Sequence, residues 1–122
     1  MASYTKAHRP DSFIRVHLAP SNAIGPGKAD LLESIAETGS IAESARRMGM
    51  SYRRAWSLVR SLNGAFNDPL IETRKGGRSG GSAVLTGTGR EVLRLYRGME
   101  TGAAKAISDD IAAFRKLLAR RS

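Results

Sequence analysis

The chain of 122 residues has 41% hydrophobic and 25% charged side chains, which is typical of one globular domain and excludes a disordered chain. It has no cysteine, which excludes disulfides and thiol chemistry, and no apolar run near the roughly 18 residues of a membrane-spanning helix. The formal net charge of +9 favours a polyanionic partner, although solubility alone would explain it equally well. No apolar signal-peptide core is present near the start, so we expect a soluble cytoplasmic protein without a membrane partner.

The first third of the chain predicts one short strand and one helix. Residues 1–11 are expected to be flexible. Alternating apolar and polar side chains over residues 12–18 predict a strand with one apolar face, and residues 19–27 predict a turn. Apolar side chains at helical spacing follow Pro26 and end before Gly39, which predicts a helix between them.

Two further helices are predicted on either side of Gly49. Ser40 and Glu43 have the spacing of a capping box, in which each side chain satisfies a free N–H group of the next helix. Ser51 is a favourable N-cap for a third helix over about residues 51–66. Two helices joined by a tight glycine turn are typical of a helix-turn-helix, although any corner between two helices would have this spacing.

The helix predicted over residues 51–66 has two dissimilar faces. At about 100° per residue, one face is apolar and would pack on the core. The opposite face has no acid and combines arginines with two aromatic rings: Tyr52, Arg53, Trp56, Ser57 and Arg60, with Asn63 at its edge. Arginine can make forked contacts to guanine edges or phosphates, and aromatic rings can pack on sugars and thymine methyl groups. This face therefore predicts a surface that enters the major groove of DNA.

Residues 70–86 predict a β-hairpin with a long, glycine-rich connection. Arg74, Lys75 and Arg78 lie at its tip, among glycines that allow the backbone to approach another surface closely. A flexible loop with incidental charge is the simpler alternative. Its position directly after a recognition helix favours a wing that contacts phosphates or the minor groove.

The last part of the chain predicts a long helix over residues 87–122, with a capping box at Thr88 and Glu91. Its continuity through residues 108–110 stays open. An approximate seam of apolar side chains follows it: Tyr96, Met99, Ala103, Ile107, Phe114 and Leu118. A monomer of this size has little spare core for this seam, which therefore predicts a dimer interface. Binding of the basic tail to an acidic membrane is a weaker alternative, because its apolar face is short.

Three motifs carry a resemblance to a known family: GSIAESARRMGMSYRRAW, GGRSGG and LTGTGREVL. Over roughly residues 12–100 the chain resembles the N-terminal DNA-binding domain of ModE-type, molybdate-responsive transcriptional regulators, a winged helix-turn-helix that is distantly similar to the LysR type. The resemblance implies that the base-contacting part of the recognition helix contains Ser51, Tyr52, Arg53 and Trp56. It also implies dimerisation through the last helix. Full-length members carry C-terminal molybdate-binding domains that are absent here, so we expect no molybdate site and no cofactor.

These observations predict a mainly α-helical protein with a small β-hairpin. A winged helix-turn-helix domain over residues 12–86 would precede a dimerisation helix over residues 87–122. We expect a homodimer that binds double-stranded DNA specifically and regulates transcription. Two alternatives stay open, namely a protein that pairs with and titrates a longer regulator, and a non-specific nucleoid-type DNA binder. An enzyme is not expected, because no nucleophile, acid–base or metal constellation is present, and the G-x-S-x-G match at residues 77–81 joins two predicted strands.

Overall fold

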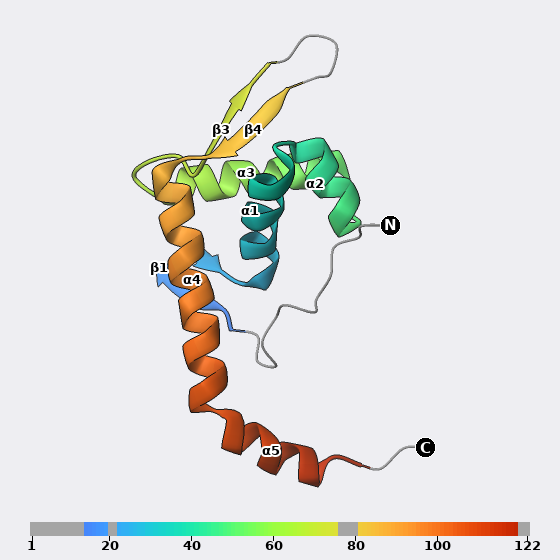
Figure 1. The fold of residues 1–122 in the computed structure, drawn as a ribbon, viewed down its shortest axis with the longest axis vertical. Helices are drawn as coiled ribbons and strands as arrows, with labels where there is room; N and C mark the ends of the chain where they lie inside the picture. Colours follow the sequence, from blue (N-terminus) through green and yellow to red (C-terminus); the bar gives the residue numbers. More distant parts are fainter. Residues whose placement is uncertain (1–13, 20–21, 76–80, 120–122) are drawn as a thin grey trace.

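The computed structural model describes residues 14–19, 22–75 and 81–119. The elements follow in this order: β1 (Val16–Ala19), β2 (Asn22–Ile24), α1 (Pro26–Thr38), α2 (Ile41–Met48), α3 (Tyr52–Ala65), β3 (Ile71–Arg74), β4 (Ser82–Leu85), α4 (Gly87–Ala106) and α5 (Ser108–Leu117). Helices α1, α2 and α3 form a head from which the β3–β4 hairpin projects, and α4 leads away from the head to α5 (Figure 1). This architecture confirms the predicted winged helix-turn-helix fold.

Short polar residues and glycines set the corner between α2 and α3. The hydroxyl of Ser51 accepts a hydrogen bond from the backbone N–H of Arg54 at 3.0 Å, which caps the start of α3. Gly39 and Gly49 end α1 and α2 with φ angles of 70° and 69°, a left-handed conformation that favours glycine. These ends agree with the predicted boundaries.

The capping box at the start of α2 forms only in part. Ser40 accepts from the N–H of Glu43 at 3.0 Å as predicted, but its own N–H donates to the hydroxyl of Thr38 at 3.2 Å. The Glu43 carboxylate instead accepts from Arg46, one turn further along α2. The arginine is a stronger partner for the carboxylate than a backbone N–H group, because the hydrogen bond joins two charged groups.

The predicted capping box at Thr88 is wrong. Helix α4 begins at Gly87, and its cap is Thr86, whose hydroxyl accepts from the N–H of Gly89 at 2.9 Å. Thr86 also donates to the carbonyl of Pro69 at 2.7 Å, so this side chain joins the base of the hairpin to α4. Thr86 is the cap because Pro69 and Leu70, which are distant in the sequence, lie beside it in the fold.

The apolar core lies where the three helices of the head meet the hairpin and α4. Its buried members come from the three helices of the head and from the hairpin: Leu31, Leu32, Ile35, Ile41, Ala45, Ala55, Val59, Leu62, Leu70, Ile71, Ala83 and Leu85. Val92 and Leu93 of α4 are partly buried and pack against them. The hairpin is antiparallel, with Ile71 opposite Leu85. Alternate residues of β4 are therefore buried and exposed, which anchors the base of the wing in the core.

A second hairpin precedes α1 and was not predicted. Strand β1 pairs antiparallel with β2, with Val16 opposite Ile24, whereas the sequence predicts a strand over residues 12–18 followed by a turn. Strand β2 has only three residues, which is too short for an alternating pattern to distinguish it from a turn. Lys28 donates to the carbonyl of Ala23 and to the hydroxyl of Ser61, at 3.2 and 3.3 Å, and so ties this hairpin to α3.

The last helix is interrupted at Ile107, which has a φ of −106° and a ψ of 11°. The break decides the open question about residues 108–110 in favour of two helices. Asp109 and Asp110 then lie in the first turn of α5, where acidic groups interact favourably with the helix dipole. Among the described residues, no helix is long and apolar enough to cross a bilayer.

A cluster of four charged side chains joins α1 to α4. The guanidinium of Arg97 contacts Asp30, Glu33 and Glu100 at 2.7, 2.9 and 2.8 Å. Asp30 and Glu100 are buried, with 3% and 1% of their surface exposed. Burial raises the pKa of Asp30, while the hydrogen bond from Arg97 opposes that rise. Burial and then the charge of Glu100 also raise the pKa of the neighbouring Tyr96 to about 12.

The close approach of α4 to the hairpin base leads to a stability prediction. A methyl group added at Gly89 would lie 2.2 Å from the carbonyl oxygen of Leu70. Gly89→Ala is therefore expected to lower the free energy of unfolding by about 3 kcal/mol, because the backbone must move apart. Gly98→Ala is the control, since no atom lies within 4 Å of an added methyl group there. Thermal melts of both variants check this, and equal stability of the two would contradict it.

Candidate nucleic-acid interface

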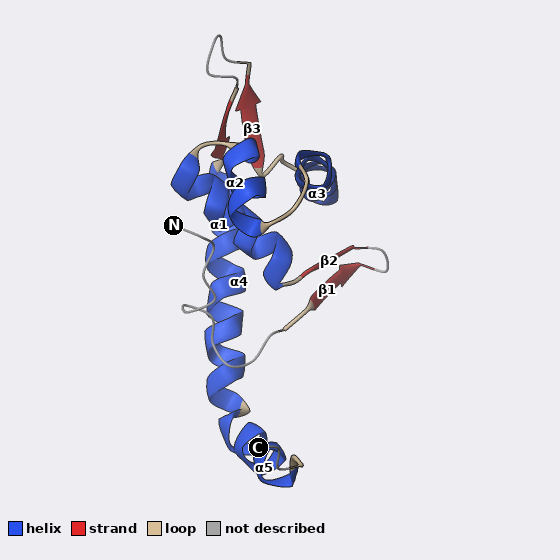
Figure 2. Cartoon of the chain, turned by 90° about the vertical axis from the view of Figure 1, so that its right-hand side faces the viewer, coloured by secondary structure: helices blue, strands red, loops and turns tan. Residues whose placement is uncertain are grey.

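Helix α3 lies at the edge of the head, where Figure 2 shows it end-on. Ala55, Val59 and Leu62 are buried in the core, as the predicted apolar face requires. On the opposite side, Arg53, Ser57 and Arg60 are exposed and follow one another along the helix. We call these three residues the outward row. Ser51 is exposed as well, at the N-cap.

The two predicted aromatic residues lie on the side of α3 that faces the wing. Their rings make an edge-to-face contact, with centroids 6.3 Å apart and an interplanar angle of 82°. Tyr52 is exposed, but Trp56 is half-buried and packs against the core. The two rings thus lie beside the outward row, on the flank of the predicted face that borders the wing.

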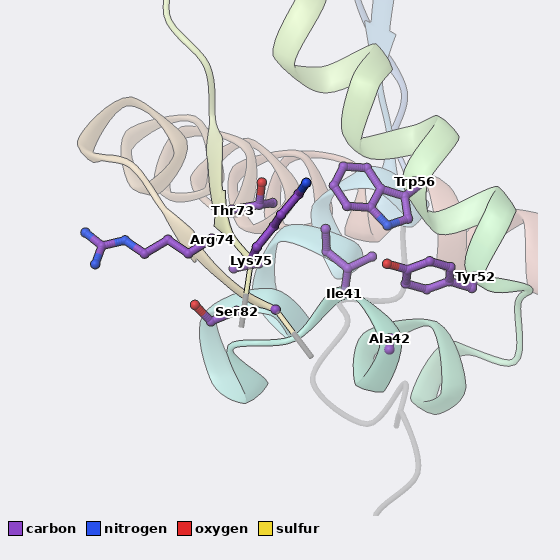
Figure 3. Close-up of a pocket in the computed structure, with 10 residues that line it drawn as sticks. Ile41, Ala42, Tyr52, Trp56, Thr73, Arg74, Lys75 and Ser82 are labelled. Atoms are coloured by element: carbon purple, nitrogen blue, oxygen red, sulfur yellow. The ribbon is translucent and has the colours of Figure 1, made fainter. Parts of the chain in front are cut away.

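An open groove of about 420 Å³ separates α3 from the wing. Its lining comes from the start of α2, the start of α3 and both strands of the wing: Ile41, Ala42, Tyr52, Trp56, Thr73, Arg74, Lys75, Gly81, Ser82 and Ala83. We call it the wing groove. In Figure 3 the Trp56 ring lies above Ile41 and the Tyr52 ring beside it, along one side of the groove. An apolar floor with cations at its rim suits the sugar–phosphate backbone of a nucleic acid.

The predicted wing cations differ in direction. Lys75 extends toward Trp56 across the wing groove, whereas the guanidinium of Arg74 points away from it (Figure 3). Both side chains are exposed. Arg78 lies outside the described residues. Both residues line the groove, but Lys75 is the one whose charged end extends toward the recognition helix.

The two arginine pairs of the helix-turn-helix differ in their electrostatics. On α2, Arg46 is paired with Glu43, and Arg47 contacts Glu37 at 3.3 Å. Arg53, Arg54 and Arg60 on α3 have no ion pair within the described part of the chain, and neither do Arg74 and Lys75. Within the helix-turn-helix and the wing, the described arginines and lysine without an ion pair therefore lie on α3 and the wing, and not on α2. Arg54, next to the outward row, was missed as a candidate, and its exposure beside Arg53 is the feature that identifies it.

Asn63 was predicted at the edge of the DNA-binding face and has a different environment. Its amide oxygen accepts from the N–H groups of Leu70 and Ile71 at 2.8 and 3.0 Å. Its amide nitrogen donates to the carbonyl of Ile71 at 3.0 Å. The side chain therefore holds the start of β3 against α3. No local pattern in the sequence indicates this pairing.

The apolar seam of the last helices is exposed only in part. Met99 is 44% exposed on α4, and Phe114 and Leu118 are 70% and 69% exposed at α5 and its end, while Ala103 and Ile107 are half-buried. Tyr96 is 1% exposed, and its hydroxyl donates to the carbonyl of Ile14 at 2.6 Å. This corrects its place in the predicted interface, because its side chain belongs to the core of its own chain.

Leu95 was missed as a member of this seam. It is 46% exposed and lies four residues before Met99, on the same side of α4. Helix α5 has no buried residue. The exposed apolar surface of α4 and α5 therefore has no cover from the described residues of its own chain.

The described residues contain no group of three His, Cys, Asp or Glu side chains that is placed to hold a metal ion. The chemistry of the surface is thus that of cations, hydroxyl groups and aromatic rings on α3 and the wing. Such a surface binds polyanions through charge neutralisation and hydrogen bonding.

Comparison with known proteins identifies a family of regulatory helix-turn-helix proteins. Residues 28–90, more than half of the chain, match the family described as bacterial regulatory helix-turn-helix protein, lysR family. The chain is 39% identical over 85 residues to the molybdenum-pterin-binding protein MopB of Rhodobacter capsulatus, covering 70% of this chain and 32% of MopB. It is 37% identical over 90 residues to the DNA-binding transcriptional dual regulator ModE of Escherichia coli K12, covering 71% of this chain and 34% of ModE. The chain thus spans about a third of the length of these relatives.

Proposed function

The chain belongs to the bacterial regulatory helix-turn-helix proteins of the lysR family, and we propose that it binds specific sites on double-stranded DNA as a homodimer and regulates transcription. The family and the ModE relatives are DNA-binding transcription regulators and not enzymes, in agreement with the prediction from sequence. The observation that carries the proposal is the set of unpaired cations on α3, next to the wing groove. We place this activity in the bacterial cytoplasm.

In the proposed complex, α3 enters the major groove. The outward row faces base edges, and Ser51 contacts a phosphate at the start of the helix. Tyr52 and Trp56 line the wing groove beside the sugar–phosphate backbone. The wing contacts the backbone or the minor groove through Arg74 and Lys75, and through Arg78 in its connecting loop. This arrangement separates the residues that select a sequence from those that hold the duplex.

The proposed homodimer uses the exposed apolar surface of α4 and α5. Its members are Leu95, Met99, Ala103, Ile107, Phe114 and Leu118, so Leu95 takes the place of Tyr96 in the predicted interface. Two recognition helices in such a dimer would contact two half-sites about one helical turn apart, roughly 34–36 Å. The interface and the DNA-binding surface occupy different elements, so each can be tested without the other.

Arg53→Ala tests the proposed function. A binding site is first selected from a random pool of duplex DNA with the wild-type protein. We expect Arg53→Ala to weaken binding to this site by about 1–3 kcal/mol and to relax the preference at one base position, because a forked contact to a base edge is lost. Fluorescence anisotropy with the selected site and with single-base variants measures both effects.

Arg46→Ala is the matched control, because Arg46 lies on α2 and is already paired with Glu43. It should leave the base preference unchanged. The affinity of the wild type should fall steeply with salt, with a log–log slope of about −0.9 for each phosphate neutralised. A flat salt response would contradict DNA binding, and equal affinity for random DNA would favour the nucleoid-type alternative. Binding that needs a longer partner protein would favour the titrating role.

A further inference from the structure

Within the described part of the chain, a single side chain of the recognition helix makes hydrogen bonds to the wing, in addition to the packing of both elements in the core. Asn63, near the end of α3, makes three hydrogen bonds to the first residues of the wing. It accepts from the N–H group of Leu70 and from that of Ile71, and it donates to the carbonyl of Ile71. No other described residue of α3 has a hydrogen bond to the wing. The Asn63 amide therefore satisfies backbone hydrogen-bonding groups at the start of β3, as the backbone of a neighbouring strand would.

The wing is also attached to the head through a backbone hydrogen bond of its other strand. The N–H group of Ala83 in β4 donates to the carbonyl of Gly39, at the end of α1, at 2.9 Å. One strand is thus tied to α3 and the other to α1. The base of the hairpin is also buried in the core and joined to α4 through Thr86, so it stays on the head when the bonds of Asn63 are lost. The bonds of Asn63 are the ones that hold the start of β3 against α3, so their loss alters the angle at which the exposed part of the wing leaves α3.

This angle determines where Lys75 lies. Lys75 follows β3, four residues after Ile71, which corresponds to about 13 Å of extended chain. A tilt of about 10° at the start of β3 would move Lys75 by about 2 Å, more than the tolerance of a hydrogen bond. Lys75 extends across the wing groove toward Trp56 (Figure 3), so such a tilt changes the width of the groove.

We propose that Asn63 is a positioning residue that fixes the wing relative to the recognition helix and thereby sets the contribution of Lys75 to DNA affinity. Asn63 does not contact DNA in this proposal. Its amide oxygen already accepts two hydrogen bonds and its amide nitrogen donates one, all to Leu70 and Ile71. The amide therefore cannot make the paired donor and acceptor contact that reads a base edge. The proposal rests on the proposed function, in which Lys75 contacts the DNA backbone.

A double-mutant cycle between Asn63 and Lys75 tests this. In the wild-type background, Lys75→Ala should lower affinity about eightfold for each protomer at about 0.1 M salt, and reduce the salt slope by about one unit for each protomer. In the Asn63→Ala background, Lys75→Ala should lower the affinity for DNA by less than about twofold, because the wing no longer holds the Lys75 ammonium group at the DNA backbone. Arg53→Ala should keep its full effect in both backgrounds.

Two further variants separate positioning from a general loss of structure. Ser61→Ala removes a hydroxyl from the same helix that does not bond to the wing, and Lys75→Ala should keep its eightfold effect there. Asn63→Asp keeps the two acceptor bonds but places a carboxylate oxygen against the carbonyl of Ile71 in place of the donor, so the Lys75 contribution should lie between those in Asn63→Ala and in the wild type. Circular dichroism melts establish that each variant is folded at the assay temperature.

An unchanged effect of Lys75→Ala in folded Asn63→Ala would overturn the proposal. Should Asn63→Ala be unfolded, the cycle is decided with Asn63→Gln, whose longer side chain displaces the amide while keeping its chemistry. A full Lys75 effect in that variant overturns the proposal, and a reduced effect supports it. If neither Arg53→Ala nor Lys75→Ala alters binding in the wild-type background, the proposed function fails instead, which is a distinct result.

Discussion

The double substitution Met99→Glu with Phe114→Glu is expected to convert the protein into monomers that bind an operator at least about 100-fold more weakly than the wild type. Both side chains are exposed on the apolar surface of α4 and α5, and α5 has no buried residue in its own chain. Two carboxylates placed in an apolar interface would have no partners there, and their desolvation opposes association. A monomer binds one half-site. In the dimer, binding of one recognition helix raises the effective concentration of the other at the second half-site, and a monomer loses this gain in affinity.

Thr101→Glu provides the matched control for this prediction. Thr101 is exposed on α4, two residues from Met99 and therefore on another side of the helix. It adds a carboxylate to α4 outside the apolar surface and should leave the protein dimeric. Sedimentation velocity measures the oligomeric state, and anisotropy with the selected site measures affinity. A double variant that still sediments as a dimer would place the interface elsewhere.

Replacing Arg97 by methionine is expected to lower the free energy of unfolding by about 3–5 kcal/mol at neutral pH. Arg97 contacts three carboxylates, and two of these, Asp30 and Glu100, are buried. Without the guanidinium, these carboxylates remain in a poorly solvated junction between α1 and α4 and repel one another. Methionine keeps much of the apolar stem of arginine, so the decrease in the free energy of unfolding measures the effect of removing the charge and its hydrogen bonds.

The loss in Arg97→Met should depend on pH. Burial already raises the pKa of Asp30 above its ordinary value of 3.8, and loss of Arg97 removes the interaction that opposes this rise. A carboxyl group whose pKa is raised in the folded state destabilises the fold as it ionises, so stability falls as the pH rises through that interval. The deficit of Arg97→Met should therefore shrink between about pH 7 and about pH 4.

Arg94→Ala is the control for this pair of measurements. Arg94 lies on the same helix and contacts Glu91, but both groups are exposed to solvent. Its removal should leave stability essentially unchanged, because water replaces an exposed ion pair at little cost. Denaturant unfolding at several pH values checks both variants. A deficit in Arg97→Met that stays constant with pH would contradict the role assigned to the buried carboxylates.

Much of the DNA-binding unit was predictable because its determinants are local. Ser51 caps α3, Gly39 and Gly49 end the preceding helices, and the apolar positions of α3 follow the helical repeat. Each of these depends on a few neighbouring residues and on backbone geometry that any chain shares. The same holds for the hairpin, whose two strand-like segments flank a glycine-rich connection.

Local patterns failed where side chains compete for the same partners. Glu43 has the spacing of a capping residue, yet it binds Arg46. Thr88 has the spacing of a cap, but Thr86 takes that place because Pro69 and Leu70 lie beside it. In both cases the sequence contains two acceptable partners, and only their positions in space select one.

The sequence by itself determined the order of the three head helices, the wing and the last helical segment, the helix-turn-helix corner, and the basic, acid-free character of one side of α3. The tertiary structure alone decided which of those side chains are available. It placed Asn63 against β3, Trp56 partly in the core and Tyr96 wholly within it, and it left Leu95 exposed. The physical reason is that helical periodicity states which residues share a side of a helix, whereas burial and pairing depend on elements that arrive from distant parts of the chain.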